Sequence, residues 1–245
     1  MIPKIIHYCW FGKKDKPTIV KKCIDSWHIY LPDYKIIEWN EENFDFNNNK
    51  YAKEAYKEGK FAFVSDVVRI EVLYKYGGIY MDTDVEVFKS FNDLLDSDNC
   101  IIGFEEKNYI ATSFIATIPK HQLIGEFLSV YRNISFYDEN GNINETTNVK
   151  KLTEILISKG LKRDGKFQIL ENNITIYPQE YFSPYDYINF VLNITNNTYC
   201  IHHFYVSWMN KTIKFKKILK KSILQIIGYR IWDKLRVCIK GEKNA

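Results

Sequence analysis

Hydrophobic and polar residues follow one another along the first 85 positions in a pattern that predicts alternating strands and helices. Residues 4–10 and 34–39 form short apolar runs typical of buried strands, and residues 16–30 have the spacing of an amphipathic helix. A second helical pattern covers residues 61–76, and Gly77 stands where helices commonly end. An apolar strand then leads into two aspartates. This order predicts an α/β fold with a largely parallel mixed sheet between helices.

Beyond residue 85 the pattern predicts shorter elements. Strands are expected at residues 100–104, 110–118, 167–170, 174–177 and 199–204, and helices at residues 119–131 and 149–159. A polar, Asn-rich stretch at residues 138–148 is typical of a surface loop. We find no internal repeat and no linker rich in Pro, Gly or Ser in the body of the chain. Residues 1–210 are therefore predicted to form one domain, followed by a helical appendage at residues 211–245.

Asp82 and Asp84 are the first candidates for chemistry. Side chains two positions apart on a strand point to the same face, so both carboxylates can converge on one cation. Hard oxygen ligands suit Mg²⁺ or Mn²⁺, and these ions commonly keep positions for water and substrate phosphates. Such an ion would neutralise a departing diphosphate. Two solvated acidic residues at a strand end are the alternative interpretation, which so short a motif leaves open.

Asp66 and Arg69 share one face of the helix that precedes this strand, because they are three residues apart. One interpretation is an exposed intrahelical ion pair, worth about 0.3–0.5 kcal/mol. Their position directly before the Asp-x-Asp strand favours a functional site instead. An arginine there can form paired hydrogen bonds to a carboxylate or to sugar hydroxyls, which a lysine cannot reproduce.

Four segments in this order resemble the DXD-containing glycosyltransferases of the family-32 type. That family includes yeast mannosyltransferases and bacterial capsule and lipopolysaccharide enzymes, and the resemblance extends to the glucosylating bacterial toxins. The segments are Ile-His-Tyr-Cys-Trp-Phe-Gly at 6–12, Ser-Asp-Val-Val-Arg at 65–69, Gly-Gly-Ile-Tyr-Met-Asp-Thr-Asp at 77–84 and His-His-Phe-Tyr-Val-Ser-Trp at 202–208. The chain departs from the family at residues 111–113, where Ala-Thr-Ser replaces the more usual Asn and Gly.

The resemblance implies a GT-A type nucleotide-diphospho-sugar transferase fold and assigns roles to individual residues. Asp66 and Arg69 would hold the donor sugar. Asp84 would bind the metal directly, and Asp82 would contact the ribose, or the metal through water. The nucleotide sugar would also meet the following residues: Trp10, which stacks on the base, Tyr80, Ser207 and Trp208. A buried core position is the alternative for Trp10.

The resemblance also implies a third metal ligand from the last segment. His202 and His203 are neighbours on a predicted strand, so only one of them faces the cleft. We assign the ligand to His202 because it stands five residues before Ser207, as in the family, and an imidazole ligand favours Mn²⁺ over Mg²⁺. A buried histidine that binds no ligand is the alternative for either position.

The activity implied is that of a metal-dependent, retaining hexosyltransferase. It would move a sugar from a nucleotide sugar, with a UDP-sugar favoured, onto a lipid-linked glycan in surface polysaccharide biosynthesis. Two alternatives stand beside it. A haloacid-dehalogenase-type phosphatase would use Asp82 as nucleophile and Asp84 as acid/base. An inactive peripheral membrane module would bind a glycan through aromatic side chains and carry out no transfer.

Composition and charge add a candidate partner. The chain is 46% hydrophobic with a net charge of +4, but residues 211–245 hold 11 basic and 2 acidic residues, against 23 and 28 in residues 1–210. The basic stretch is amphipathic, which is typical of a helix lying on an anionic membrane, although a helix packed on the body is the alternative. Nucleic-acid binding is not expected of an acidic body.

The location expected is the cytoplasm, peripheral on the inner face of the cell membrane. The N-terminus shows no apolar leader, and five scattered cysteines show no metal or disulfide spacing, so reduced thiols are expected.

If residues 211–245 form an interfacial helix, the full-length protein should co-sediment with anionic liposomes. Each lysine near the surface contributes about 1 kcal/mol, and this attraction is screened by salt, so the protein should detach as the salt concentration rises. A chain truncated after Asn210 should stay in the supernatant and still bind donor. Loss of donor binding or unfolding on truncation would show instead that this segment packs on the body.

Overall fold

The computed structural model describes residues 1–96, 98–132, 134–144, 146–187 and 189–205. Ser207, Trp208 and the basic segment 211–245 lie outside the described residues, so the predictions made for them stay predictions. The strands are β1 (Ile5–Cys9), β2 (Lys35–Trp39), β3 (Gly78–Met81), β4 (Val85–Val87), β5 (Cys100–Glu106), β6 (Tyr109–Ile110), β7 (Phe114–Thr117), β8 (Gln168–Leu170), β9 (Ile174–Tyr177), β10 (Tyr185–Asp186), β11 (Val191–Leu192) and β12 (Cys200–His202).

The α-helices are α1 (Thr18–Tyr30), α2 (Lys50–Lys57), α3 (Phe61–Tyr76), α4 (Asn92–Leu95), α5 (Gln122–Arg132), α6 (Asn148–Ser158) and α7 (Gln179–Phe182). Two short 3₁₀ helices cover Phe46–Asn48 and Glu171–Asn173. The predicted strands and helices therefore agree with the observed ones to within a few residues. The exception is the run predicted at 110–118, which is divided between β6 and β7.

The central sheet has the strand order β2-β1-β3-β7-β5-β9-β8, with β6 paired to β5. β1 runs parallel to β2 and β3, and β5 runs parallel to β9, while β7 is antiparallel to both its neighbours and β8 is an antiparallel edge. Five of these seven strands thus point the same way, as the largely parallel mixed sheet predicts. Two small sheets, β10-β11 and β12-β4, lie outside it.

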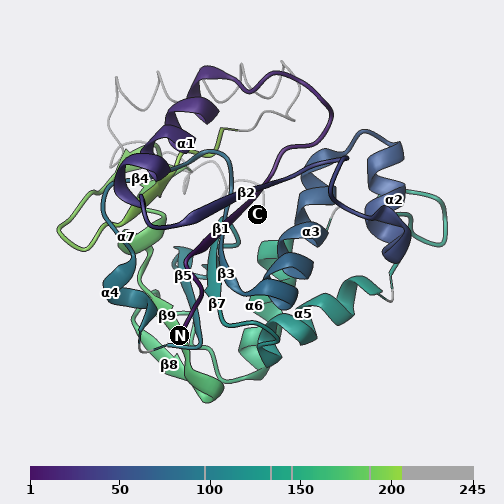
Figure 1. Ribbon diagram of the computed structural model, residues 1–245. Coiled ribbons are helices and arrows are strands. Elements are labelled where there is room, and N and C mark those ends of the chain that lie inside the picture. The colour runs from purple at the N-terminus through teal and green to yellow at the C-terminus, as the bar shows by residue number, and fades with distance from the viewer. Residues whose placement is uncertain (97, 133, 145, 188, 206–245) are drawn as a thin grey trace, which may run out of the picture.

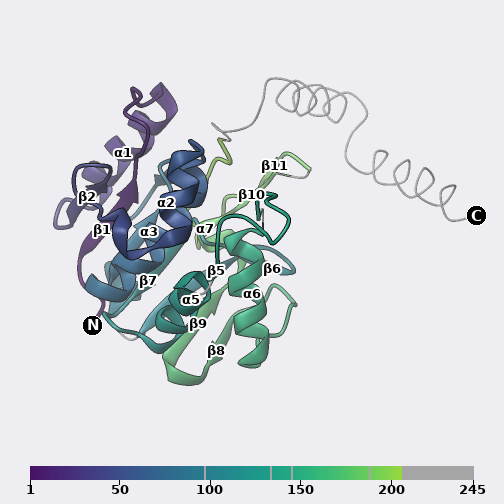
Figure 2. The same ribbon diagram turned by 90° about the vertical axis from the view of Figure 1, so that its right-hand side faces the viewer.

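Helices cover both faces of the sheet, and each face has its own apolar core. Helices α2, α3, α5 and α6 lie on one side and α1, α4 and α7 on the other (Figure 1), and the turned view shows the same layers (Figure 2). The first core is built mainly from α3 and α5, with Leu73 and Phe127 buried against the sheet. The second core includes Trp27 of α1 and Phe182 of α7. This is the α/β sandwich predicted from the sequence.

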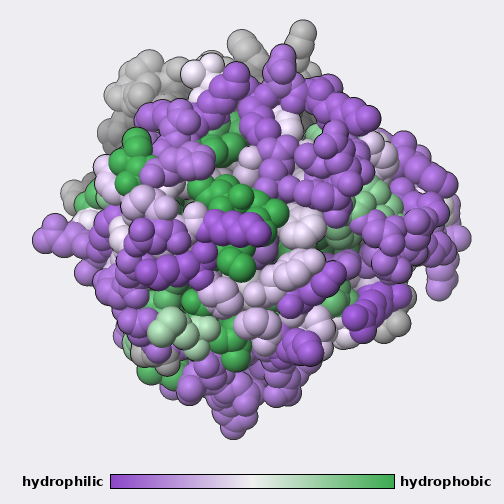
Figure 3. Space-filling model, viewed as in Figure 1, coloured by the Kyte–Doolittle hydropathy of each residue, from purple (hydrophilic) through white to green (hydrophobic). Residues whose placement is uncertain are grey.

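The face of the molecule that Figure 1 presents is largely hydrophilic (Figure 3). Apolar side chains gather near its middle, where the edge strand β2 crosses the molecule (Figure 3). Within the described residues, no helix combines the length and the apolar character needed to span a membrane.

The paired glycines between α3 and β3 set the approach of helix and sheet. Gly77 has φ +64° and Gly78 has φ +91°, a region that favours glycine. A Cβ on Gly78 would lie 2.5 Å from the carbonyl oxygen of Ile5 in β1, and one on Gly77 would lie 2.7 Å from the nitrogen of Pro119. The two glycines therefore let β3 begin immediately after α3 and lie close against β1.

The side chain of His7 in β1 forms hydrogen bonds to Gly77 at this junction and to Trp39 of β2. Its side chain is fully buried, Nε2 lies 3.0 Å from the carbonyl oxygen of Gly77, and Trp39 Nε1 donates to Nδ1 at 3.1 Å. Nδ1 must be unprotonated to accept that bond, so the ring is neutral. Burial, with a smaller contribution from Lys35, lowers the pKa of His7 to about 4. The hydrogen bond to Gly77 opposes this shift.

The buried imidazole should make the protein less stable in acid. Because the pKa of His7 is lower in the folded state, its contribution is complete above pH 6.5 and is lost as the pH falls toward 4, by about 3 kcal/mol in all. Urea unfolding of wild type and His7→Gln over this range measures the difference. The His7→Gln curve should be flatter, while exposed His28→Gln should follow wild type; parallel curves for all three would contradict the assignment.

Candidate active site

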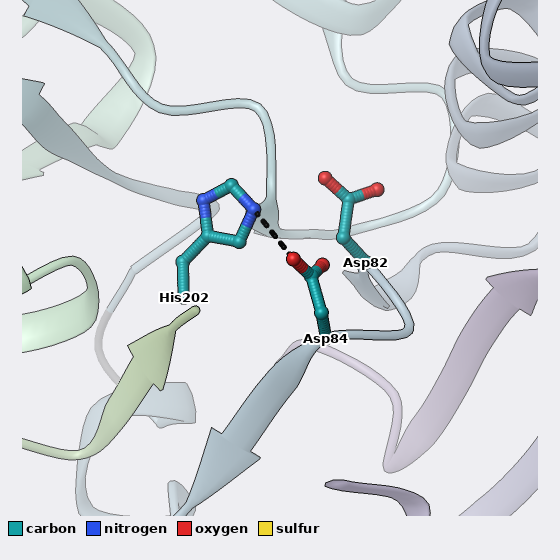
Figure 4. A group of neighbouring side chains, drawn as sticks. All are labelled: Asp82, Asp84 and His202. Atoms are coloured by element: carbon teal, nitrogen blue, oxygen red, sulfur yellow. Dashed lines mark ion pairs between the residues drawn. The ribbon is translucent and has the colours of Figure 1, made fainter. Parts of the chain in front are cut away.

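Asp82 and Asp84 meet in a turn and not along a strand. β3 ends at Met81 and β4 begins at Val85, and the amide of Val85 donates to the carbonyl of Asp82 at 3.0 Å. The strand geometry predicted for the pair was therefore wrong, although the predicted convergence of the two carboxylates was right. The turn brings both carboxylates to the same side, beyond the C-terminal end of β3 (Figure 4).

His202 joins the two aspartates from the far end of the described chain. β12 pairs antiparallel with β4 in a register that sets His202 opposite Val85, next to Asp84. Its Nε2 lies 3.4 Å from Asp84 Oδ2 (Figure 4). His203 points elsewhere, with Nε2 2.8 Å from Glu86 Oε2. The geometry thus favours His202 over His203.

The three side chains form a donor set suited to a divalent cation. One ligand atom each from Asp82, Asp84 and His202 lies within 4.8 Å of the others. Two carboxylates and one imidazole fit Mn²⁺ and related ions better than Ca²⁺, which prefers oxygen ligands only. His202 Nδ1 is buried and has no hydrogen-bond partner among the described residues. The residues present therefore fit a metal ion.

Charge pairing already organises this set. Burial alone would raise the pKa of Asp84, but His202 and the amide of Tyr205 hold it below its ordinary value. Burial alone would lower the pKa of His202, but Asp84 and then Asp82 raise it to about 9. Asp84 Oδ2 also accepts from the amide of Tyr205 at 2.7 Å, and its carbonyl accepts from the amide of His203 at 3.0 Å. One aspartate therefore holds the chain segment that carries the histidine.

Arg69 connects the Asp82 turn to the rest of the sheet. Its guanidinium is buried and lies 2.9 Å from Asp66 Oδ1, 3.2 Å from Asp82 Oδ1 and 2.7 Å from the carbonyl oxygen of Thr112, to which it donates. It also lies over the ring of Tyr80, 4.6 Å from the centroid. Burial alone would lower the pKa of Arg69, but Asp82, Tyr80 and Asp66 raise it. The exposed ion pair considered above is therefore ruled out.

Asp66 lies at the edge of the same cluster, and its side chain is partly buried. Burial raises its pKa to about 6; Arg69 and Lys151 oppose that shift and Asp82 adds to it. Behind it, Asn148 donates to the carbonyl of Asp66 at 3.1 Å, and Lys151 donates to the hydroxyl of Tyr131 at 3.1 Å. Arg69 of the same helix thus holds the Asp66 carboxylate, while α6 is joined to Asp66 through its backbone carbonyl.

Tyr80 and Trp10 differ in how they could meet a nucleotide. Tyr80 is 1% exposed, and its hydroxyl donates to Asp82 Oδ1 at 3.0 Å. It can therefore act on a nucleotide only through Asp82, which corrects the direct contact expected from the sequence. Trp10 follows β1 and is half-buried, and its Nε1 donates to the carbonyl oxygen of Lys14 at 2.6 Å. Stacking on a base stays a prediction for it.

Two features of the site were missed. The segment 111–113 lines it through the backbone: Thr112 accepts from Arg69, and Ser113 accepts from the amide of Asp82 at 2.9 Å. The buried hydroxyl of Ser113 has no partner among the residues described. Glu105 is the second feature, since burial raises its pKa to about 7 with His202 as its strongest charged neighbour. The departure from the family pattern at 111–113 pointed to the first feature, and no sequence pattern pointed to Glu105.

The comparisons with known proteins agree with this geometry. Residues 17–101 match the model of a family described as a glycosyltransferase sugar-binding region containing a DXD motif. The matched region contains Asp66, Arg69, Asp82 and Asp84. His202 lies outside it.

The chain is similar along most of its length to lipid-modifying relatives. It is 25% identical over 239 residues to mannosyl phosphorylinositol ceramide synthase SUR1 of Saccharomyces cerevisiae, covering 93% of this chain and 57% of that protein. It is 36% identical over 138 residues to inositol phosphoceramide mannosyltransferase 3 of Schizosaccharomyces pombe, covering 49% and 38%. The chain therefore spans less than three fifths of the length of these relatives.

Among solved structures, the chain resembles the PaToxG glycosyltransferase. The TM-score is 0.52 at 21% identity, over 64% of this chain and 68% of that chain. At this identity the likeness shows the fold alone, and the predicted GT-A fold is confirmed.

Removing the Arg69 guanidinium should destabilise the protein far more than removing an exposed helical lysine. Arg69→Met leaves the partly buried Asp66 and Asp82 without their cation, so the free energy of unfolding should fall by about 3 kcal/mol, the lower end of the range for breaking a buried ion pair. Arg69→Lys keeps the charge and should cost less. Lys150→Met, which breaks the exposed Lys150–Glu154 pair, should cost at most about 0.5 kcal/mol. Urea titrations compare the three; equal losses in Arg69→Met and Lys150→Met would show that the network contributes nothing.

Proposed function

From the sugar-binding region of DXD-containing glycosyltransferases at residues 17–101, we propose that this protein transfers a sugar from a nucleotide sugar to a glycan acceptor with the aid of a divalent metal. The class of the enzyme, a DXD-containing glycosyltransferase, agrees with the prediction from sequence. The observation that carries the proposal is the meeting of Asp82, Asp84 and His202 within 4.8 Å, beside the buried Asp66–Arg69 pair.

The geometry divides the work among the residues. Asp82, Asp84 and His202 would hold Mn²⁺ or Mg²⁺, which when bound stabilises negative charge on a leaving diphosphate. Arg69 fixes the orientation of Asp82 and Asp66, since it reaches both carboxylates at once. Asp66 is then placed to accept hydrogen bonds from the hydroxyls of a donor sugar.

The acceptor proposed is a lipid-linked glycan. Two relatives are named as a mannosyl phosphorylinositol ceramide synthase and an inositol phosphoceramide mannosyltransferase, and both names contain a lipid. The basic amphipathic segment 211–245 is consistent with work at an anionic membrane surface, on its cytoplasmic face. A UDP-sugar donor, retention of anomeric configuration and a role in surface polysaccharide synthesis rest on the family resemblance drawn from the sequence.

The phosphatase alternative fits the site poorly. A nucleophilic Asp82 would need high electron density on its carboxylate to attack phosphorus. Oδ1 of Asp82 instead accepts from Tyr80 and lies beside Arg69, and both contacts withdraw electron density from it. An inactive glycan-binding module would not require this set of metal-ligating and sugar-orienting side chains to be intact.

Nucleotide binding should depend on metal and on Asp84. Calorimetry with UDP and GDP should show binding in Mn²⁺ that weakens at least about tenfold in EDTA, because a cation held by the carboxylates would offset the charge of the diphosphate. Asp84→Asn should remove the Mn²⁺ effect. Glu86→Gln is the matched control, since Glu86 faces His203 and Lys22 and should keep it. Equal affinity with and without metal in the wild type would contradict the proposed function.

A further inference from the structure

Phe204 stands two residues after His202 and has a backbone conformation that is rare for a bulky side chain. Its φ is +52°, in the left-handed region, where the side chain crowds its own backbone. β12 ends at His202, so the chain leaves the ladder directly before this turn. Such outliers persist only where surrounding contacts impose them, and they cluster at binding and catalytic sites. The conformation of Phe204 therefore points to a role in the site beside it.

Asp84 supplies the contacts that impose this conformation. The amide of His203 donates to the carbonyl oxygen of Asp84 at 3.0 Å, and the amide of Tyr205 donates to Asp84 Oδ2 at 2.7 Å. The residues on both sides of Phe204 are thus bound to one aspartate. A change of Phe204 to a negative φ would redirect the chain between these two bonds, so the left-handed turn is part of the same arrangement.

The left-handed turn lays the Phe204 ring on the imidazole of His202. The two ring centroids are 3.9 Å apart, with 36° between the ring planes. Side chains two positions apart on a regular strand are separated by about 6.6 Å, so the turn, and not strand spacing, produces this contact. The Nε2 atom of the covered imidazole is directed at Asp84, 3.4 Å from Oδ2 (Figure 4). The Phe204 ring therefore restricts the rotation that would swing Nε2 away from the aspartates.

The other face of the Phe204 ring packs on the β10–β11 hairpin. Tyr187, in the turn of the hairpin, lies 4.3 Å from Phe204 between centroids, and Tyr185 of β10 lies 6.3 Å from it. Two rings as close to Phe204 as those of His202 and Tyr187 cannot share one of its faces, so Phe204 lies between them. The hairpin is a small sheet apart from the central one (Figure 2). A continuous stack of rings thus leads from the hairpin to His202.

We propose that Phe204 is a positioning residue for the metal site: its ring, held between Tyr187 and His202, keeps Nε2 directed toward the cation and couples metal binding to the hairpin. This inference rests on the proposed function, because it presupposes a metal held by Asp82, Asp84 and His202. A hydrogen bond to the second ring nitrogen commonly orients such a ligand. Nδ1 of His202 is buried without a partner among the described residues, so ring stacking takes that part here. Phe204 does not contact the metal itself.

The first test measures metal affinity. Mn²⁺ is titrated into the full-length protein with excess UDP and, in parallel, excess GDP, and free Mn²⁺ is followed by electron paramagnetic resonance. Phe204→Ala should raise the Kd for Mn²⁺ about 3–10-fold, the factor to which one aromatic pair corresponds. Phe204→Tyr keeps the ring and should stay within about twofold of wild type. Equal Kd values for wild type and Phe204→Ala would overturn the proposal.

The matched control is Phe88→Ala. Phe88 is also a phenylalanine that directly follows a strand of the β4–β12 ladder, but it is exposed, and within the described residues its ring meets no other aromatic ring. Its removal should leave the Kd for Mn²⁺ at the wild-type value. A loss equal to that of Phe204→Ala would overturn the proposal, because it would mean that any aromatic ring near this ladder has the same effect.

A further substitution separates the ring from the backbone conformation. Asparagine adopts the left-handed region readily, so Phe204→Asn keeps the turn and removes the ring. If the ring positions His202, this variant should lose as much Mn²⁺ affinity as Phe204→Ala. Wild-type affinity in Phe204→Asn would overturn the proposal, since only the path of the backbone would then matter. Thermal unfolding of each variant, expected within a few degrees of wild type, excludes misfolding as the cause.

Reciprocal measurements test the coupling to the hairpin. Tyr187→Ala should raise the Kd for Mn²⁺ about threefold in wild type and have no further effect in a Phe204→Ala background, because both rings act through one stack. Coupling between two sites is mutual, so Mn²⁺ with nucleotide should slow amide hydrogen exchange at residues 185–192 in wild type and not in Phe204→Ala. Additive losses in the double variant, or hairpin exchange that ignores Mn²⁺ in wild type, would overturn the proposal.

The wild-type titration distinguishes this inference from the proposed function. Failure of wild type to bind Mn²⁺ with either nucleotide would refute the proposed function, and the role of Phe204 with it. Normal binding by wild type together with unchanged Kd values in Phe204→Ala and Phe204→Asn would overturn the role of Phe204 alone.

Discussion

The buried guanidinium of Arg69 is the contact on which the site depends. A charge removed from water is tolerated only when it is paired and hydrogen-bonded, and Arg69 meets that condition through Asp66, Asp82 and the carbonyl of Thr112. These partners come from α3, from the turn after β3 and from the segment before β7. One side chain thus fixes three parts of the chain relative to one another, and the planar fork of arginine makes the arrangement rigid.

The same arrangement prepares the site for a cation. With His202 protonated, the three aspartates exceed the two cationic side chains by one negative charge. A divalent ion in place of the histidine proton would bring the cluster to neutrality, so the carboxylates would not repel a diphosphate bound beside it. Asp82, Asp84 and His202 would then bind the cation more tightly when a nucleotide is present, because the diphosphate adds negative charge next to the ion.

Local sequence patterns were sufficient for the parts of the site that lie close together in the chain. The Asp66–Arg69 spacing was read correctly because helix periodicity acts over a few residues, and the convergence of Asp82 and Asp84 was right although a turn, and not a strand, produces it. The turn between β3 and β4 was not foreseen, because alternation of polar and apolar residues from Met81 to Val85 also fits a continuous strand. Tyr80 is buried with Arg69 over its ring, a contact between a helix and a strand that the periodicity of either element alone cannot report.

Long-range pairing decided the rest. His202 reaches Asp84 only because β12 aligns with β4 in one register, and a shift of a single residue would turn His203 toward the aspartates instead. That ladder has three residue pairs, too few to be stable alone. It is held by Asp84, which binds the amides of His203 and Tyr205 through its carbonyl and its side chain, and by the Lys22–Glu86–His203 contacts. The residue that would bind the metal thus also secures the strand that delivers the third ligand, so assembly of the site and docking of β12 are one event.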